Sequence, residues 1–234
     1  MSSDSSIQHS VYNPDISSVI IERLKSTNTP FTANDNISHL ISQHEHDELL
    51  VDVEQKVTDL LKSLIIDTDH DPNTRETAYR IAKMFVNETL RGRYEAPPKI
   101  TTFPNTKHLD EMVVTKAEVK SLCSHHFQNI HGWAWVGIIY GDTLMGLSKI
   151  HRIVDHFSRR PQIQEELVVQ IADFIEEVCS PVGVGVVIKA DHSCVKARGV
   201  EQDSFMVSSV LRGCLMNPTA RAEFFELIKL SGSI

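Results

Sequence analysis

The stretch that decides the fold is Ile130-His131-Gly132-Trp133-Ala134-Trp135-Val136-Gly137-Ile138-Ile139-Tyr140, which is rich in β-branched and aromatic residues. A second β-rich run, Met112–Val119, precedes it, and Gly141-Asp142 follows it as a turn signal. Further strands are expected over 184–190, 194–200 and 205–210. These runs predict that a sheet occupies the C-terminal half of the chain.

Helical patterns interrupt and follow these strands. Apolar residues at three-to-four spacing predict helices over 149–159 and 162–179, with Pro161 at a favoured early position of the second. A last helix is expected over 218–230. The order of strands, two helices, strands and helix is typical of an α+β fold rather than of strict βαβ alternation.

The N-terminal part has a different character. Helices are predicted over 45–66 and 74–90, with Gly92 just past the end of the second, and a short helix is expected over 16–25. Residues before position 45 are rich in Ser, Asn, Asp and Thr. We therefore expect three parts: a partly flexible N-terminal extension (1–44), an N-terminal helical region (45–110) and the domain that carries the sheet (111–234).

Composition excludes several classes of protein. The chain has 234 residues, 41% of them hydrophobic, which is enough for a real core. Its 23 basic and 31 acidic side chains give a formal charge of −8, which disfavours a nucleic-acid binder. The sequence contains no apolar run long enough to span a membrane and does not begin like a signal peptide, so we expect a cytoplasmic protein without membrane association.

Cysteine and histidine gather in two clusters. The first is Cys123-Ser124-His125-His126 and the second is His192-Ser193-Cys194, which together offer two thiols and three imidazoles. Three protein ligands with one open position describe a catalytic zinc site, whereas four describe a structural one. The first cluster alone fits a buried thiol beside surface histidines equally well. The second cluster shifts the balance toward a metal site, without choosing among the five side chains.

Basic and acidic side chains form two further candidates. Lys149 and Arg152 share a face if their segment is helical, and Lys196 and Arg198 share a face if theirs is a strand, so both pairs suit a phosphate-bearing ligand. For Arg159 and Arg160, a solvated charged face is the simpler interpretation. The run Gln162–Glu165 is either an acidic first helical turn or a carboxylate that accepts hydrogen bonds from a heterocycle such as guanine.

Five motifs, taken in order, resemble GTP cyclohydrolase I of the zinc-dependent type. The resemblance covers roughly residues 45–230. Its motifs are Asp71-Pro72 through Arg80-Ile81-Ala82-Lys83-Met84; Cys123-Ser124-His125-His126-Phe127; Gly146-Leu147-Ser148-Lys149-Ile150 with Arg152-Ile153-Val154; Arg160-Pro161-Gln162-Ile163-Gln164-Glu165; and His192-Ser193-Cys194-Val195-Lys196-Ala197-Arg198-Gly199.

The resemblance implies a fold, a reaction and a partner. The fold is the tunnelling fold, an antiparallel sheet with helices on one face, here preceded by an N-terminal helical segment. The reaction is hydrolysis of GTP to 7,8-dihydroneopterin triphosphate and formate, through a zinc-activated water that attacks C8 of guanine. The resemblance further implies a homodecamer with active sites at subunit interfaces, and a place in pterin biosynthesis, from which folate and one-carbon metabolism follow.

Roles carried over from the resemblance fall on thirteen residues. The metal ligands would be Cys123, His126 and Cys194. His192 would protonate N7 of guanine, and His125 would support the proton transfers. The remaining residues would bind substrate: Glu165 with Gln164 beside it at the guanine edge; Ser148, Lys149, Arg152 and Arg198 at the ribose and triphosphate; and Arg80 and Lys83 at the triphosphate, from a neighbouring subunit.

The chain departs from the common motifs at two places. Ser124 stands where the family has Glu, and Thr77-Ala78-Tyr79-Arg80 replaces the usual Thr-Pro before the upstream arginine. Neither change removes a proposed ligand or acid, although Ser124 removes a negative charge beside the metal.

Three alternative functions fit the sequence less well. A non-catalytic, GTP-binding or regulatory paralogue would keep the fold, but the chain retains His192 beside a full ligand set. A related pterin or deazaguanine enzyme, such as the nitrile reductase, would need a cysteine nucleophile and a nicotinamide site. A structural zinc module would leave Glu165, Lys149 and Arg152 without a purpose.

Overall fold

The computed structural model describes residues 15–232, which form two compact units. Described residues up to Pro30 belong to the first unit together with Ile37–Asn87, and the second unit contains Phe31–Asn36 and the chain from Glu88 onward. The three-part division expected from the sequence stays a prediction. Its extension includes residues 1–14, which lie outside the described residues.

The first unit is helical. It contains α1 (Ile16–Ser26), the short turn η1 (Ser38–Leu40), α2 (Gln43–Ser63) and α3 (Thr77–Lys83). Ile16, Ile20 and Leu24 form the buried stripe of α1, which confirms the predicted short helix. The long helix predicted over 45–66 is also confirmed, and it begins two residues earlier because Ser42 caps it.

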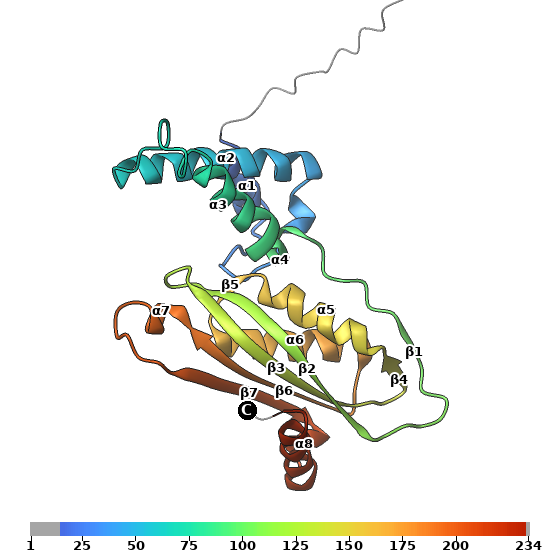
Figure 1. Cartoon of the computed structure of the whole chain (residues 1–234). Coiled ribbons are helices and arrows are strands. Elements are labelled where there is room, and N and C mark those ends of the chain that lie inside the picture. Colours follow the sequence, from blue (N-terminus) through green and yellow to red (C-terminus); the bar gives the residue numbers. More distant parts are fainter. Residues whose placement is uncertain (1–14, 233–234) are drawn as a thin grey trace, which may run out of the picture. The chain divides into compact units, whose positions relative to one another are not determined.

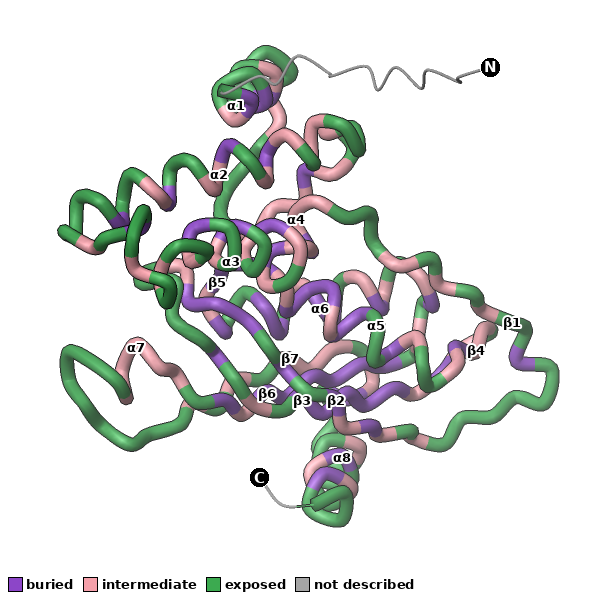
Figure 2. Tube along the Cα trace, turned by 45° about the horizontal axis from the view of Figure 1, so that its top comes forward, coloured by how far each residue is buried: buried purple, intermediate pink, exposed green. Residues whose placement is uncertain are grey.

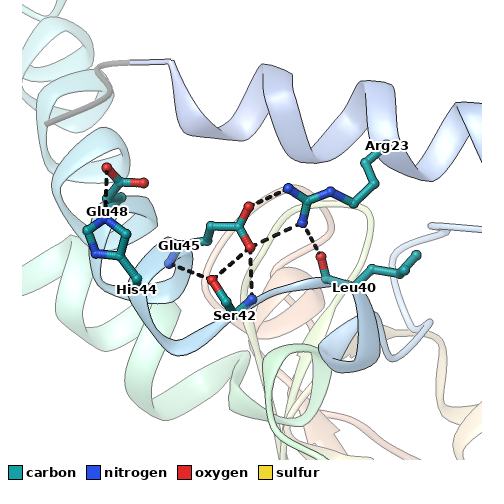
Figure 3. Close-up of polar contacts among 6 residues, drawn as sticks. All are labelled: Arg23, Leu40, Ser42, His44, Glu45 and Glu48. Carbon is teal, nitrogen blue, oxygen red and sulfur yellow. Dashed lines mark hydrogen bonds and ion pairs between the residues drawn. The ribbon is translucent and has the colours of Figure 1, made fainter. Parts of the chain in front are cut away.

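Glu45 ties the start of α2 to α1. Its carboxylate accepts hydrogen bonds from the Arg23 guanidinium and from the backbone N–H and hydroxyl of Ser42, while Arg23 also donates to the carbonyl of Leu40 (Figure 3). The Arg23 hydrogen bond is the largest cause that lowers the pKa of Glu45 to about 2. One side chain thus completes a capping box and an ion pair between two helices.

The second unit is built on a five-stranded sheet with strand order β5-β2-β3-β6-β7. Neighbouring strands run antiparallel except β5, which runs parallel to β2. The strands are β2 (Met112–Cys123), β3 (Asn129–Ile139), β5 (Pro161–Gln162), β6 (Gly183–His192) and β7 (Phe205–Gly213), and a separate pair is formed by β1 (Thr102–Pro104) and β4 (Thr143–Met145). The structure confirms the sheet predicted from the sequence patterns and the antiparallel pairing that the family resemblance implies.

Two helices cover one face of this sheet. Figure 1 shows α5 (Leu147–Ser158) and α6 (Gln164–Cys179) side by side over the sheet. Alternate residues of the central strands, such as Val136 and Ile188, are fully buried against Ile153 and Ile171 of these helices, in the core coloured as buried in Figure 2. This core fixes the strand ends from which the site is built.

The last helix packs on the opposite face. Trp135 and Val187 point away from α5 and α6 and enclose a small core with Phe224 and Ile228 of α8 (Pro218–Leu230). Gly137 makes this contact possible, because a Cβ atom there would lie 2.4 Å from the Phe224 ring. The predicted final helix is confirmed, and it lies on the face that the two central helices leave open.

The strand predicted over 194–200 is wrong. Residues Ser193–Lys196 form the short helix α7, and the chain then loops until β7 begins at Phe205. The Lys196 amine is held between Asp191 and Asp203 at 3.0 and 2.6 Å, and the N–H of Gln202 donates to the carbonyl of Val195. These contacts close a loop in place of the predicted strand, on which Lys196 and Arg198 would have shared a face.

The boundaries of two other helices also differ. The helix predicted from residue 162 begins at Gln164, because the backbone of Pro161 and Gln162 pairs with Leu122 and Cys123 of β2. The helix predicted over 74–90 is confirmed only as α3, which passes into a π-helical turn (Met84–Thr89) and then α4 (Arg91–Tyr94).

Gly92 lies inside α4 and not beyond a helix end. It is buried, and a Cβ atom there would lie 2.2 Å from the carbonyl oxygen of His156. Glycine is therefore required here for close packing rather than for ending a helix.

Candidate active site and metal centre

Two thiols and one imidazole converge at the end of the sheet. The Sγ atoms of Cys123 and Cys194 and a ring nitrogen of His126 all lie within 4.8 Å of one another. Of the five side chains that the sequence offered, these three form the group that could hold a metal ion among residues 15–232. Soft sulfur and imidazole nitrogen donors fit Zn²⁺, and three such ligands are the number found at catalytic zinc sites.

The β2–β3 turn positions two of the three ligands. Cys123 is the buried last residue of β2, and its N–H donates to the carbonyl of Gln128 at 2.8 Å. The N–H of Phe127 returns to the carbonyl of Cys123 at 2.8 Å, and Phe127 adopts a positive φ of 52°. This tight turn holds His126 on the same side as the Cys123 thiol.

Cys194 follows β6, the strand that pairs with β3 on the edge opposite β2. It lies in α7, directly after β6, whose last residue His192 pairs with Ile130 of β3. Burial is the largest cause that raises the pKa of the Cys194 thiol, and the neighbouring Cys123 sulfur raises it further, while Arg198 lowers it. Two thiolates this close repel each other, and a metal cation bound between them would remove that repulsion.

His192 and Gln164 meet beside this group. Nε2 of His192 lies 2.9 Å from Oε1 of Gln164, the first residue of α6. Burial lowers the pKa of His192, and the negative charges of Glu165 and Asp191 oppose the shift. The imidazole of His192 and the carboxylate of Glu165 therefore lie near each other, where the end of β6 meets the start of α6.

Gln164 and Glu165 differ sharply in exposure although they are neighbours. Gln164 is fully buried and its side-chain amide is bonded to protein groups, whereas Glu165 is exposed in the first turn of α6. Of the two, Glu165 is the side chain that a ligand can reach.

The polar start of α5 carries three more of the candidate residues. Ser148 and Arg152 are exposed, and Lys149 is half-buried with its amine 3.4 Å from the carbonyl oxygen of Lys99. The side chains of Lys149 and Arg152 share one face of α5, as the spacing predicted.

The remaining candidates are placed separately. Arg198 is exposed in the loop after α7, close enough to Cys194 to lower the pKa of its thiol. His125 is exposed in the β2–β3 turn, with its ring centroid 6.4 Å from that of His126. Arg80 and Lys83 are exposed on α3 in the other compact unit, where Arg80 pairs with Glu76 at 2.8 Å.

Arg160 is the residue that the sequence placed wrongly. A solvated charged face was expected, but the side chain is 5% exposed. Its guanidinium donates to the carbonyls of Gly92 and Asn34, each at 3.0 Å, and lies over the Phe157 ring. Burial lowers its pKa to about 10. The sequence carried no signal of this burial, because the carbonyl partners of Arg160 come from distant segments of the chain.

Comparison with known proteins decides the family. The sequence profile of the family described as GTP cyclohydrolase I matches residues 53–229, which is most of the chain. The chain belongs to the GTP cyclohydrolase I family. The GTP cyclohydrolase I family consists of enzymes, and the complete Cys-His-Cys group lies inside the matched region.

Named relatives agree with this assignment. GTP cyclohydrolase 1 of Aeromonas hydrophila is 42% identical over 163 residues, covering 68% of this chain and 75% of the relative. GTP cyclohydrolase 1 of Aeromonas salmonicida is 40% identical, with 76% and 83% covered, and that of Photobacterium profundum is 39% identical, with 86% and 90% covered. The chain is therefore an enzyme with the function of a GTP cyclohydrolase I.

The chain has a weak likeness to one solved structure among those compared. The crystal structure of the archaeosine synthase QueF-Like in the apo form is 18% identical, with a TM-score of 0.35, and covers 42% of this chain and 91% of that one. Among residues 15–232, no helix is both long and apolar enough to cross a membrane.

Proposed function

We propose that the chain hydrolyses GTP to 7,8-dihydroneopterin triphosphate and formate at the site formed by Cys123, His126, Cys194, His192 and Glu165. The observation that carries the proposal is the convergence of the three ligand atoms within 4.8 Å, beside a histidine and an exposed carboxylate. A metal site beside a proton donor (His192) and a carboxylate that can bind guanine (Glu165) suits hydrolysis of a purine ring.

Cys123, His126 and Cys194 would hold Zn²⁺. The donor set fits this ion, since two sulfurs and one imidazole nitrogen lie close enough to share it. When bound, zinc supplies a Lewis acid and a source of hydroxide close to neutral pH.

The protein side chains supply recognition and proton transfer. Glu165 would accept hydrogen bonds from N1–H and the exocyclic amine of guanine, an arrangement that a charged acceptor strengthens. His192 would donate a proton to N7, which makes C8 a better electrophile, and His125 would support the later proton transfers. Both hydrolytic steps, ring opening and release of C8 as formate, need protons moved at defined atoms.

The triphosphate would be bound by the basic residues. Ser148, Lys149 and Arg152 on α5 and Arg198 after α7 present hydroxyl, ammonium and guanidinium groups that suit phosphate oxygens. Arg80 and Lys83 would contribute from a neighbouring subunit. Binding energy remote from C8 would hold the base in register for the reaction.

We further propose that subunits assemble through the sheet into a homodecamer, with active sites at subunit interfaces. Strand β7 lies at the edge of the sheet, and Phe205 and Val207 on it are 58% and 47% exposed. Among the described strands β7 pairs only with β6, and an open sheet edge with exposed apolar side chains is a template for pairing with another chain. The enzyme would act in the cytoplasm, and its product would enter pterin biosynthesis.

The test is product analysis by mass spectrometry after incubation with GTP, with and without a zinc chelator. Formate and dihydroneopterin triphosphate, both lost on chelation and restored by added zinc, are the expected result. Unchanged GTP bound to zinc-loaded protein would overturn the proposal in favour of a non-catalytic paralogue, an alternative that the named relatives do not favour. A ring-opened formamide product would place the defect after the first hydrolysis.

A further inference from the structure

The side-chain amide of Gln164 forms its hydrogen bonds with other groups of the protein. It is 0% exposed, and its Nε2 lies 3.0 Å from the carbonyl oxygen of Ile188, 3.2 Å from that of Met206 and 2.9 Å from Oγ of Ser208. Its Oε1 lies 2.9 Å from Nε2 of His192. Both polar atoms of the amide are therefore engaged by β6, β7 and the histidine.

The chemistry of these partners allows one orientation of the amide. Backbone carbonyls only accept hydrogen bonds, so the amide nitrogen has to face Ile188 and Met206. The amide oxygen then has to face His192, and it too can only accept. It follows that His192 donates from Nε2, and that its lone pair in the neutral ring lies on Nδ1.

We propose that Gln164 is a positioning residue for the reaction, which acts by holding His192 with Nε2–H toward the protein and Nδ1 free to exchange a proton with the substrate. This inference rests on the proposed function, in which His192 is the acid toward N7 of guanine. It gives Gln164 a role different from that of its neighbour Glu165, which is exposed and which the proposed function assigns to guanine.

The frame around Gln164 is rigid enough for this task. Ile188 lies within the sheet opposite Ser208 of β7, so two paired strands fix the amide nitrogen at once. Gln164 is also the first residue of α6, so the helical turn that anchors His192 is the turn that presents Glu165. The acid and the base-recognition carboxylate are thereby set at a fixed separation by one turn of backbone.

The first experiment compares Gln164→Met with Gln162→Met in the zinc-loaded enzyme. Methionine keeps the approximate length of glutamine but removes the strong acceptor. Gln162 is the matched control: it is 1% exposed on the same segment, and its amide donates to Phe157 and Ser121 and accepts from Gln170, with His192 absent from the partners given for it. Zinc content and circular dichroism establish that both variants are folded and loaded.

We expect kcat of Gln164→Met to fall by roughly 10- to 100-fold, less than the ~10²- to 10⁴-fold that loss of a general acid costs. KM for GTP, and the ratio of activity on GTP to that on inosine triphosphate, should stay within about twofold. A raised KM or a changed ratio would make Gln164 a guanine contact and overturn the proposal. An equal loss in Gln162→Met would reduce the effect to general damage of the fold.

A double-mutant cycle tests whether Gln164 acts through His192. In a His192→Ala background, Gln164→Met should cost less than about twofold, because the group it positions is gone. Losses that multiply in the double variant would show that Gln164 acts independently of His192, against the proposal.

A measurement without turnover separates this inference from the proposed function. Solid-state ¹⁵N NMR of histidine-labelled protein distinguishes the two ring tautomers, and the His192 signals are assigned by their absence in His192→Ala. Protonated Nε2 with unprotonated Nδ1 is expected in the wild type, and a mixture of tautomers in Gln164→Met. The opposite tautomer in the wild type would refute the proposal even if GTP is hydrolysed, whereas the expected tautomer without product would refute only the proposed function.

Discussion

Nη2 of Arg160 lies 2.7 Å from Nε2 of His156, and both side chains are buried. A guanidinium can only donate, so this ring nitrogen of His156 accepts and the ring is neutral. Burial is the largest cause that lowers the pKa of His156 to about 4, and the positive charge of Arg160 adds to the effect.

This pair predicts that acid begins to weaken the fold near pH 6.5, before carboxylates titrate. An unfolded chain binds a proton at His156 near pH 6.5, while the native state binds it near pH 4, so the free energy of unfolding falls as pH decreases between these values. The contribution of this residue is at most ~1.4 kcal/mol per pH unit. Urea unfolding at pH 7.5, 6 and 5 measures it.

The control for this prediction is His156→Gln, which keeps an acceptor for Arg160 but does not titrate. Its free energy of unfolding should decline less steeply than that of the wild type over the same window. Zinc loss at low pH affects both proteins, so the difference between them isolates His156. Equal slopes would show that His156 is not neutral in the native state.

The helical unit should show a second, more acidic transition. Glu45 has a native pKa of about 2 against an ordinary value near 4.5, so its stabilising contribution is complete above pH 4.5 and is lost between pH 4.5 and 2. Glu45→Gln keeps a capping oxygen but loses the ionic contact with Arg23, and we expect faster amide hydrogen exchange in the first turn of α2. Lys25→Gln, which removes an exposed pair with Glu22, should leave exchange there unchanged.

The metal centre predicts a sharp difference among cysteines. Cys123→Ser and Cys194→Ser should each lower zinc content well below one ion per chain and reduce activity at least ~100-fold, because two remaining ligands hold zinc poorly. Cys214→Ala is the matched control, since this half-buried thiol lies outside the cluster at the end of β7. Zinc quantified by mass spectrometry together with steady-state rates tests the set, and full zinc in Cys194→Ser would remove that residue from the ligands.

Adjacent carboxylates offer a test of base recognition. Glu165→Gln replaces one of two acceptor oxygens with a donor, and the loss of a charge-assisted hydrogen bond of ~1.5–3 kcal/mol corresponds to roughly 10- to 150-fold in kcat/KM for GTP. Glu166→Gln is the control one residue further along α6, where the carboxylate accepts from Asn34 at 2.9 Å. Equal effects of the two substitutions would contradict the assignment of Glu165 to guanine.

Local patterns predicted most of the fold because they report burial. The β-branched and aromatic content of β3 and the helical stripe of α6 both reflect residues that pack in the core, and the structure confirms the strand and the helix. The failure at 194–200 has a physical cause as well. Lys196 pairs with Asp191 and Asp203, contacts between side chains that no period in the sequence reveals.

The metal ligands of the site were predicted from the sequence, but the buried polar residues around it were not. Cys123, His126 and Cys194 carry their chemistry in their residue types, so two short clusters were enough to propose a metal centre. The burial of Arg160 and Gln164 was not accessible, because glutamine and arginine are usually exposed and their partners come from distant strands and loops. Only the fold shows that these polar groups are satisfied inside the protein.

The short parallel pairing of β5 with β2 has a consequence for how this enzyme can be altered. Leu122 and Cys123 lie in register with Pro161 and Gln162, and the N–H of Ser124 donates to the carbonyl of Gln162 at 3.2 Å. Backbone atoms, rather than side chains, therefore set the spacing between a sulfur donor and the helix that carries Glu165. Side-chain exchanges such as serine at 124 leave that spacing intact, whereas inserting or deleting one residue in either segment shifts both functions together.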